Sequence, residues 1–183
     1  IDWRTRRSVP VHRYWQDGPT TLKLGADWHA APQTPIYVEG RRYMTNAFSS
    51  SPGGFGSVVG IWRMEQGLAV PAAAAGTFSD WPPLQAAEFK SLAPEKTDRR
   101  KLFFVWSDLN GDQRPQPNEV TTAVDDGIQH NNGKHVGGTY VGPDLSLTTA
   151  FGLHLKPLRF TDRGVPVYDT AQVQRLVKQV EFH

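Results

Sequence analysis

Oxygen-bearing side chains recur at a regular spacing directly after a hydrophobic run in the middle of the chain. The run is FFVWS, which ends at Ser107, and the spacing counts from Asp108 as position one. Side-chain oxygens occupy positions one, three, five, nine and twelve, and position seven adds a backbone carbonyl; these residues are Asp108, Asn110, Asp112, Gln116 and Glu119, with Arg114 at position seven. Ca²⁺ takes about six to eight oxygen ligands, and carboxylates with amides suit it better than zinc or copper. The sequence therefore predicts a structural calcium loop over residues 108–119.

The loop resembles the calcium loops of EF-hand and dockerin domains, with two departures. Gln113 stands where those loops usually place the glycine of a sharp turn. Pro115 stands where a β-branched residue normally pairs with a partner loop. Residues 101–107 read as a strand, so a helix-loop-helix EF-hand is not expected. The alternative interpretation is a hydrated turn rich in Asp and Asn, but Glu119 at the twelfth position favours the ion.

Two histidines flank a polar, glycine-containing stretch, HNNGKHVGG, further along the chain. His130 and His135 are candidates for a general base or a metal ligand, because loops on a β-rich scaffold often carry the active site. Asp125 and Asp126 lie just upstream and supply carboxylates for acid–base or metal chemistry. The alternative is a solvated turn, which the spacing of the two histidines favours because it matches no standard metal motif. Whether the protein is an enzyme therefore stays open.

A further candidate lies in GADWHAAPQ, where an aromatic ring stands beside polar groups. Trp28 and His29 form a candidate ligand-binding pair, since an exposed tryptophan can stack on a sugar ring. The alternative places Trp28 in the hydrophobic core. The glycine-rich stretch SSSPGGFGS lacks the phosphate-loop pattern, and the chain contains neither a nucleophile-elbow motif nor a zinc-protease motif.

Composition excludes several classes of function. The 183 residues contain no cysteine, which excludes disulfides, thiolate metal sites and cysteine nucleophiles. The net charge is +2 and the basic residues are scattered, so nucleic acid is not an expected partner. No apolar run approaches the roughly 20 residues that a membrane-spanning helix needs. The chain begins with Ile-Asp-Trp, which we interpret as the interior of a longer protein.

Turn-forming residues are frequent and helical periodicity is scarce, which predicts an all-β fold. Gly contributes 17 residues and Pro 14, and most segments between them read as short strands. Residues 170–180 place apolar side chains at helical spacing, although a strand remains an alternative there. Residues 84–92 form a second helical candidate, which opens after two consecutive prolines.

Two segments of the chain are similar without gaps, which suggests an internal repeat. Residues 36–48 align with residues 139–151, and identities fall in register on both sides of a central turn. Each segment is followed by a second hairpin-like piece that ends in Val-Pro. The expected fold is therefore a series of antiparallel four-stranded repeats, with repeat-like units at residues 36–100 and 139–170. Chance similarity between amphipathic hairpins is the alternative.

Three stretches together, VVGIWRMEQG, FFVWSDLNGDQRPQPNEV and LRFTDRGVPVYD, resemble blade segments of large secreted bacterial β-propellers. In such proteins loops of the form W-x-D-x-N-G-D-x-x-x-Q-x-x-E connect blades, and the likeness covers residues 37–169. The resemblance implies a calcium-stapled propeller that is secreted or periplasmic. A propeller closes with about four to eight blades. Residues 1–183 would then form a single segment of two or three blades, a partial β-propeller that needs the remaining blades of a parent chain or another subunit.

A resemblance of fold does not transfer an activity, because propellers carry many different ones. Our first expectation is a calcium-stabilised extracellular segment whose parent binds or processes a polysaccharide or another extracellular ligand. The second is a structural module in the assembly of a larger extracellular complex or fibre. The third is a subunit of a propeller enzyme with a catalytic histidine at position 130 or 135.

Overall fold

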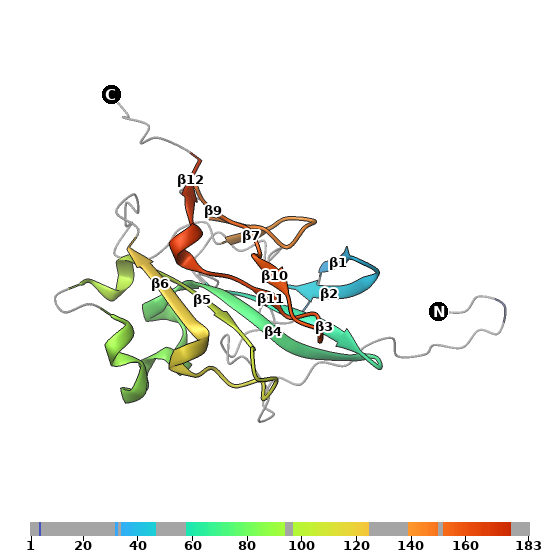
Figure 1. Ribbon diagram of the computed structural model, residues 1–183, viewed down its shortest axis with the longest axis horizontal. Helices are drawn as coiled ribbons and strands as arrows, with labels where there is room; N and C mark the ends of the chain where they lie inside the picture. The colour runs from blue at the N-terminus through green and yellow to red at the C-terminus, as the bar shows by residue number, and fades with distance from the viewer. Residues whose placement is uncertain are drawn as a thin grey trace.

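The protein is all-β over the part of the chain that the structure describes (Figure 1). The computed structural model describes residues 4, 32, 34–46, 58–93, 97–124, 139–149 and 152–176. Antiparallel strands and short 3₁₀ helices make up its regular structure, which confirms the all-β class expected from the sequence; the four-stranded repeats of a partial β-propeller stay a prediction. No helix among these residues has the length and apolar character needed to cross a membrane. Six candidate residues lie outside the described ranges: Trp28, His29, Asp125, Asp126, His130 and His135.

One antiparallel sheet of six strands forms the middle of the molecule. Its strands pair in chain order: β1 (Thr34–Val38), β2 (Arg41–Thr45), β3 (Val58–Glu65), β4 (Leu68–Thr77), β5 (Leu102–Ser107) and β6 (Val120–Val124). Two-residue turns join β1 to β2 and β3 to β4, and all four turn residues have positive φ angles. Such turns match the right-handed twist of the strands that they connect. The chain therefore builds this sheet from local hairpins.

A smaller sheet and a separate hairpin come from the C-terminal part of the chain. The sheet has the spatial order β12-β9-β8-β7, formed by β7 (Thr139–Val141), β8 (Leu147–Thr149), β9 (Leu153–Leu155) and β12 (Gln174–Arg175). The hairpin pairs β10 (Arg159–Phe160) with β11 (Pro166–Val167). Short 3₁₀ helices fill the connections: η2 (Phe78–Asp80), η3 (Pro82–Gln85), η4 (Ala87–Leu92), η5 (Arg99–Lys101), η6 (Pro117–Glu119) and η7 (Thr170–Gln172).

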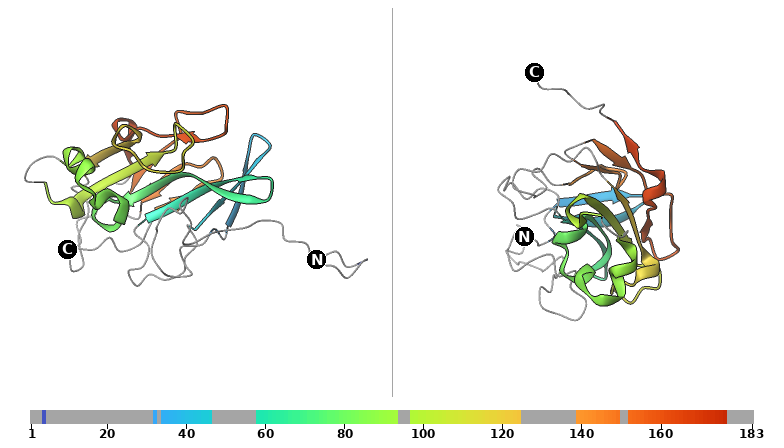
Figure 2. Two further views of the ribbon diagram at one scale, coloured as in Figure 1. Left: turned by 90° about the horizontal axis from the view of Figure 1, so that it is seen from below. Right: turned by 90° about the vertical axis from the view of Figure 1, so that its left-hand side faces the viewer.

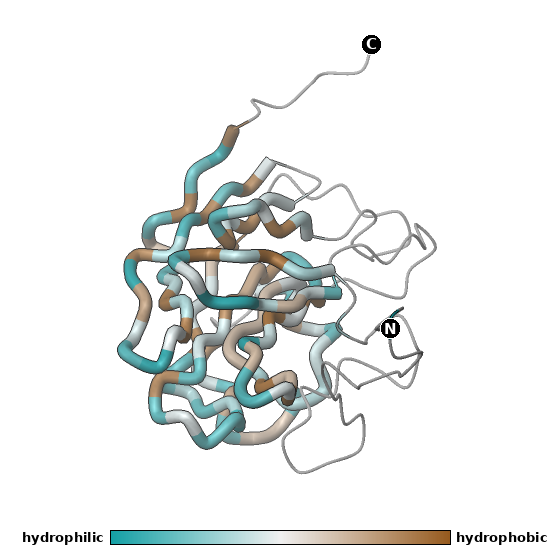
Figure 3. Tube along the Cα trace, turned by 90° about the vertical axis from the view of Figure 1, so that its right-hand side faces the viewer, coloured by the Kyte–Doolittle hydropathy of each residue, from teal (hydrophilic) through white to brown (hydrophobic). Residues whose placement is uncertain are grey.

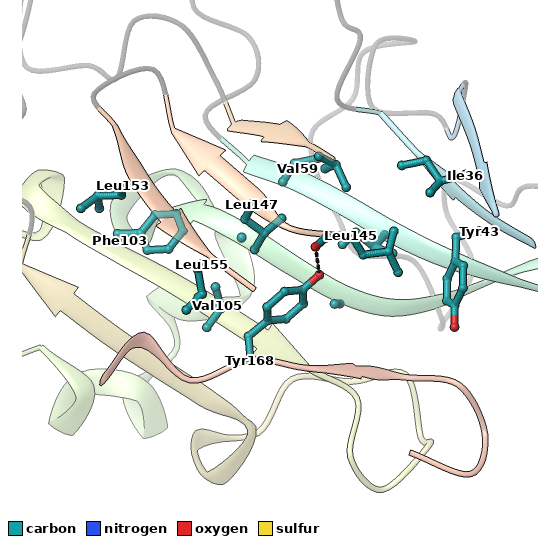
Figure 4. Packing of buried hydrophobic residues seen from close by; sticks show 14 residues of the cluster. Ile36, Tyr43, Val59, Phe103, Val105, Leu145, Leu147, Leu153, Leu155 and Tyr168 are labelled. Atoms are coloured by element: carbon teal, nitrogen blue, oxygen red, sulfur yellow. Dashed lines mark hydrogen bonds between the residues drawn. The ribbon is translucent and has the colours of Figure 1, made fainter. Parts of the chain in front are cut away.

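Strand β5 shows how the six-stranded sheet is buried on both faces. Because side chains alternate along a strand, Phe103 and Val105 point into a cluster shared with the smaller sheet (Figure 4). Leu102, Phe104 and Trp106 point into a second cluster, which the helices η2, η3 and η4 complete. The sheet thus lies between the 3₁₀ helices and the C-terminal strands (Figure 2). Elsewhere along the chain trace, hydrophobic and hydrophilic residues are interspersed (Figure 3).

Both segments of the sequence repeat fold as hairpins, β1–β2 and β7–β8. Their connections differ in length, because Val38 pairs with Arg41 across a two-residue turn whereas Val141 pairs with Leu147 across a longer one. Residues that align in the sequence therefore do not all occupy matching positions in the two hairpins. The first unit supplies the first four strands of the six-stranded sheet. The second unit divides its strands between the smaller sheet and the β10–β11 hairpin.

The two helical candidates of the sequence had different outcomes. Residues 84–92 are helical, but as the 3₁₀ segments η3 and η4, which the extended backbone of Ala86 (ψ 154°) separates. The helix expected over residues 170–180 is wrong for its described part, which holds η7 and the short strand β12. Gln174 and Arg175 pair there with β9, so pairing across the sheet outweighs the local helical periodicity.

Candidate metal site

The loop at residues 108–119 connects two paired strands of the six-stranded sheet. Strand β5 confirms the strand predicted before the loop, and it begins at Leu102. The Asp108 backbone N–H donates to the Ala72 carbonyl at 2.9 Å, so strand-like bonding to β4 continues into the first loop residue. At the far end, Trp106 of β5 pairs with Val120 of β6. The sheet therefore holds both ends of the loop side by side.

Three carboxylates of the loop converge. Asp108, Asp112 and Glu119 each offer an oxygen, and these oxygens lie within 4.8 Å of one another. Asp108 is 1% exposed and Glu119 5% exposed, while Asp112 lies on the solvent side. Carboxylates this close repel one another when ionised, and a cation between them removes that repulsion. The structure thus brings together the charged residues that the sequence predicted as metal ligands.

Side-chain oxygens at alternate positions also shape the loop. Asp108 Oδ1 accepts from the Gln113 N–H at 3.0 Å. Asn110 Oδ1 accepts from the Asp112 N–H at 2.9 Å, and Asp112 Oδ1 accepts from the Arg114 N–H at 2.8 Å. Such bonds from Asp and Asn to backbone N–H groups a few residues ahead curl the chain into consecutive turns. The side chains at positions one, three and five therefore hold the loop in shape. Each has a second oxygen or lone pair that takes no part in these bonds to the backbone.

Gln113 adopts the left-handed conformation for which the calcium loops that this one resembles use glycine. Its φ is 63°, in the left-handed region, and Gly111 before it has a φ of 81°. Left-handed backbone is unfavourable for a residue with a Cβ by about 1–2 kcal/mol. The sharp turn expected at this position is thus present although the glycine is not, and the bond from the Gln113 N–H to Asp108 helps to hold it.

Glu119 accepts hydrogen bonds from the start of the loop and from the strand before it. Its Oε1 accepts from the backbone N–H groups of Leu109 at 2.8 Å and Asn110 at 3.1 Å, and its Oε2 accepts from Trp106 Nε1 at 3.1 Å. Charge-assisted bonds of this kind are stronger than neutral ones. Sequence analysis missed the Trp106 contact, although the tryptophan two residues before Asp108 was the available signal.

The two amide side chains expected as ligands meet at the exposed rim. Asn110 Nδ2 donates to Gln116 Oε1 at 2.7 Å, and Gln116 Nε2 donates to Asp112 Oδ2 at 2.5 Å. Both amides thus lie beside the carboxylate cluster, but their hydrogen bonds are to each other and to Asp112. For Arg114 the structure shows the backbone N–H bond to Asp112, and the use of its carbonyl as a ligand stays a prediction.

Asp108 is a buried carboxylate of the site whose pKa is raised. Burial raises the pKa of Asp108, the Gln113 N–H bond opposes the rise, and the charges of Glu119 and Asp112 add to it. Among the described residues, Asp108 Oδ2 has no hydrogen-bond partner. An unpaired oxygen of a buried carboxylate is unfavourable unless a cation or a proton binds it.

At the solvent side, hydrogen bonding outweighs burial. Slight burial acts to raise the pKa of Asp112, but hydrogen bonds from Arg114, Gln116 and Asn110 have the larger combined effect, and the pKa is lowered. The exposed Asp112 is therefore more readily ionised than the buried Asp108. The donor set consists of hard oxygens alone, which fits Ca²⁺.

Two arginines that the sequence did not single out lie next to the loop. Arg63 of β3 is buried, and burial lowers its pKa while the charge of Asp108 acts to raise it. Arg163, in the turn between β10 and β11, donates from Nη1 to the Asn110 carbonyl at 3.1 Å. Both residues come from segments far from the loop in the sequence, so no local pattern could identify them.

One histidine lies in the described part of the chain. His154 of β9 contacts Thr148 of β8, with 2.9 Å between Nδ1 and Oγ1. This is a cross-strand polar pair on the smaller sheet. The sequence candidates His130, His135, Trp28 and His29 stay predictions, because they lie outside the described residues.

Comparison with known proteins adds no functional information. No family model, curated protein or solved structure matches the chain. The interpretation of the site therefore rests on the chemistry and geometry of its own residues.

Proposed function

We propose that residues 108–119 bind a divalent cation, Ca²⁺, and that the ion is a structural staple of the six-stranded sheet. The observation that carries this proposal is the buried Oδ2 of Asp108, which has no hydrogen-bond partner among the described residues and lies in a cluster with two other carboxylates. A buried, ionised oxygen of this kind is stabilised by a bound cation.

The donor chemistry favours calcium over other ions. The cluster contains carboxylates and no imidazole or thiolate, and the chain has no cysteine. Asp108, Asp112 and Glu119 supply charge, while Asn110 and Gln116 stand at the rim with amide oxygens that can turn toward an ion. Mg²⁺ demands a tighter octahedral site and usually keeps several waters, whereas Ca²⁺ accepts a flexible loop.

The ion would act on stability and on loop geometry. It neutralises repulsion among carboxylates at the junction of β5 and β6, and it leaves the hydrogen bonds of Glu119 to the loop in place. A ligand that binds the folded state alone stabilises it by mass action. The expected role of the loop is therefore structural.

For the whole segment we propose a partial β-propeller within a secreted or periplasmic bacterial protein, whose parent binds or processes a polysaccharide or another extracellular ligand. The sequence resemblance supports this proposal, together with two antiparallel sheets that share a hydrophobic cluster. Because η2, η3 and η4 cover the other face of the six-stranded sheet, further blades would join beyond the smaller sheet.

Calorimetric titration of Ca²⁺ into chelator-treated protein tests the metal site. We expect binding heat for the natural chain and its loss in Asp108→Asn, which keeps the size of the side chain and removes its charge. Glu88→Gln is the matched control, because Glu88 is an exposed carboxylate on η4 that does not belong to the carboxylate cluster. Equal heats for the natural chain and Asp108→Asn would remove the site.

A further inference from the structure

Arg163 reaches from the turn between β10 and β11 to the proposed cation-binding loop, residues 108–119, called the cation loop below. Its Nη1 donates to the Asn110 carbonyl at 3.1 Å. The same atom occupies the space that a side chain at residue 111 would need, since a Cβ on Gly111 would lie 1.8 Å from it. Gly111 thus serves two requirements, a positive φ and the close approach of a guanidinium.

The turn that carries Arg163 is itself anchored to the six-stranded sheet. Side chains of β2 and β3 donate to three neighbouring carbonyls of the turn: Arg41 Nη2 to Asp162 at 3.0 Å, Arg63 Nη1 to Arg163 at 3.1 Å and Tyr43 Oη to Gly164 at 2.7 Å. Gly164 has a φ of 81°, and a Cβ there would lie 2.3 Å from Arg41 Nη1. The position of the Arg163 backbone is therefore set by the sheet rather than by the hairpin alone.

We propose that Arg163 is a positioning residue for the cation site, an inference that rests on the proposed function. By holding the Asn110 carbonyl, Arg163 fixes the segment between Asp108 and Asp112. Asn110 and Asp112 then keep the bond that joins them, from the Asp112 N–H to Asn110 Oδ1. Cation binding and the docking of the β10–β11 hairpin are thereby coupled, since each favours the same loop conformation.

Two effects of Arg163 on cation affinity have opposite signs. Its positive charge repels a cation, whereas its hydrogen bond orders the loop that binds one. Arg163 is exposed, so solvent screens its charge strongly. We expect the positioning effect to exceed the repulsion. Removal of the side chain therefore lowers the affinity for a cation, although it removes a like charge.

Terbium luminescence measures this effect directly. Tb³⁺ is a hard cation that replaces Ca²⁺ in oxygen sites, and Trp106, which donates to Glu119, is placed to sensitise its emission. The natural chain is compared with Arg163→Ala, with Arg163→Lys and with the matched control Arg159→Ala, an exposed arginine on β10 of the same hairpin. Affinity comes from titration, Ca²⁺ affinity from competition, and the number of metal-bound waters from emission lifetimes in light and heavy water.

We expect Arg163→Ala to weaken Tb³⁺ and Ca²⁺ binding about three- to tenfold, the effect of one hydrogen bond that orders a loop. The number of metal-bound waters should rise, a change that a merely structural role would not produce. Arg163→Lys, which keeps the charge and one flexible donor, should recover part of the affinity. Arg159→Ala should bind as the natural chain does.

Equal or tighter binding by Arg163→Ala, at an unchanged number of bound waters, would overturn the positioning role and leave the metal site intact. If the natural chain itself binds neither Tb³⁺ nor Ca²⁺, the proposed function fails instead. Thermal unfolding in chelator identifies a variant that does not fold, and Arg163→Lys then decides the question on folded protein. Affinity of Arg163→Lys equal to that of the natural chain, with unchanged hydration, contradicts the proposal as well.

Discussion

Asp108 combines a satisfied oxygen with an unsatisfied one. Oδ1 accepts from the Gln113 N–H, whereas Oδ2 is buried and has no partner among the described residues. Burial, together with neighbouring carboxylates, raises the pKa of Asp108 in the folded state. A raised folded pKa contributes stability that is fully present below the unfolded pKa and is lost as pH rises through the folded pKa. Without a cation, the ionised Asp108 at neutral pH therefore destabilises the fold.

We predict that Asp108→Asn stabilises the chelator-treated protein at neutral pH by about 1 kcal/mol, because it removes a buried charge that burial and two neighbouring carboxylates disfavour. The same variant should no longer be stabilised by Ca²⁺. Urea unfolding with chelator and with Ca²⁺ measures both effects. The gain should shrink as pH falls toward the unfolded pKa of Asp, since the natural carboxyl is then protonated. A variant less stable than the natural chain in chelator, across this range, would contradict the interpretation of Asp108.

The cation loop depends on the two strands that flank it, β5 and β6. Register places Trp106 opposite Val120, so Glu119 lies beside the indole of Trp106 and beside the first backbone N–H groups of the loop. Trp106 in turn packs against Trp81, at 5.7 Å between ring centroids, and Trp81 stacks on Phe104 at 4.9 Å. The loop is therefore connected through Trp106 to the hydrophobic cluster under the 3₁₀ helices. Glu119 thus stabilises the β5–β6 pair even without an ion.

We predict that Glu119→Gln destabilises the protein in chelator, in contrast to Asp108→Asn. Both carboxylate oxygens of Glu119 accept hydrogen bonds from N–H groups. A glutamine amide in either orientation would therefore turn its NH₂ group toward one of these N–H groups. The loss of charge-assisted bonds and the new donor conflict should lower the free energy of unfolding by about 2 kcal/mol. Urea unfolding in chelator, followed by tryptophan fluorescence, measures this change. Unchanged stability in chelator would show that Glu119 acts only through a metal.

The packing of the two sheets passes through Tyr168. Its hydroxyl donates to the Leu145 carbonyl at 2.6 Å within the cluster that both sheets share (Figure 4). Its backbone N–H donates to Ser107 Oγ at 3.2 Å, next to the start of the cation loop. Full burial raises the pKa of Tyr168 well above its usual value, with smaller contributions from Asp144 and Tyr43. Ionisation of this phenol is therefore incompatible with the assembled layers.

We predict that the protein loses stability steeply above about pH 10, the range in which tyrosine ionises in an unfolded chain. The pKa of Tyr168 is higher in the folded state, so its contribution is fully present below the unfolded pKa and is lost as pH rises through the folded pKa. Tyr168→Phe should be less stable at neutral pH by about 1 kcal/mol, through the lost hydrogen bond, yet less sensitive to alkali. The control is Tyr140→Phe, since Tyr140 is exposed. Parallel pH profiles for the natural chain and Tyr168→Phe would contradict this prediction.

Local features were the ones that the sequence predicted well. The strand before the loop, the hairpins and the spacing of Asp108, Asp112 and Glu119 depend on residues close together in the chain. Turn residues and alternation act over a few positions, so they are readable without a structure. Helical periodicity was the weak signal, since residues 170–172 form a short 3₁₀ helix and Gln174 and Arg175 pair with β9 instead.

The sequence by itself determined that this chain forms antiparallel strands and that oxygen-bearing side chains gather in one twelve-residue loop. Only the tertiary structure decided that Asp108 is buried with an unpaired oxygen, that Glu119 is bonded to Trp106 and that Arg163 lies against Gly111. Burial and pairing of this kind depend on which distant strands face each other. The hydrophobic pattern fixes which side of a strand is buried, but the partner layer is chosen by packing of the whole molecule.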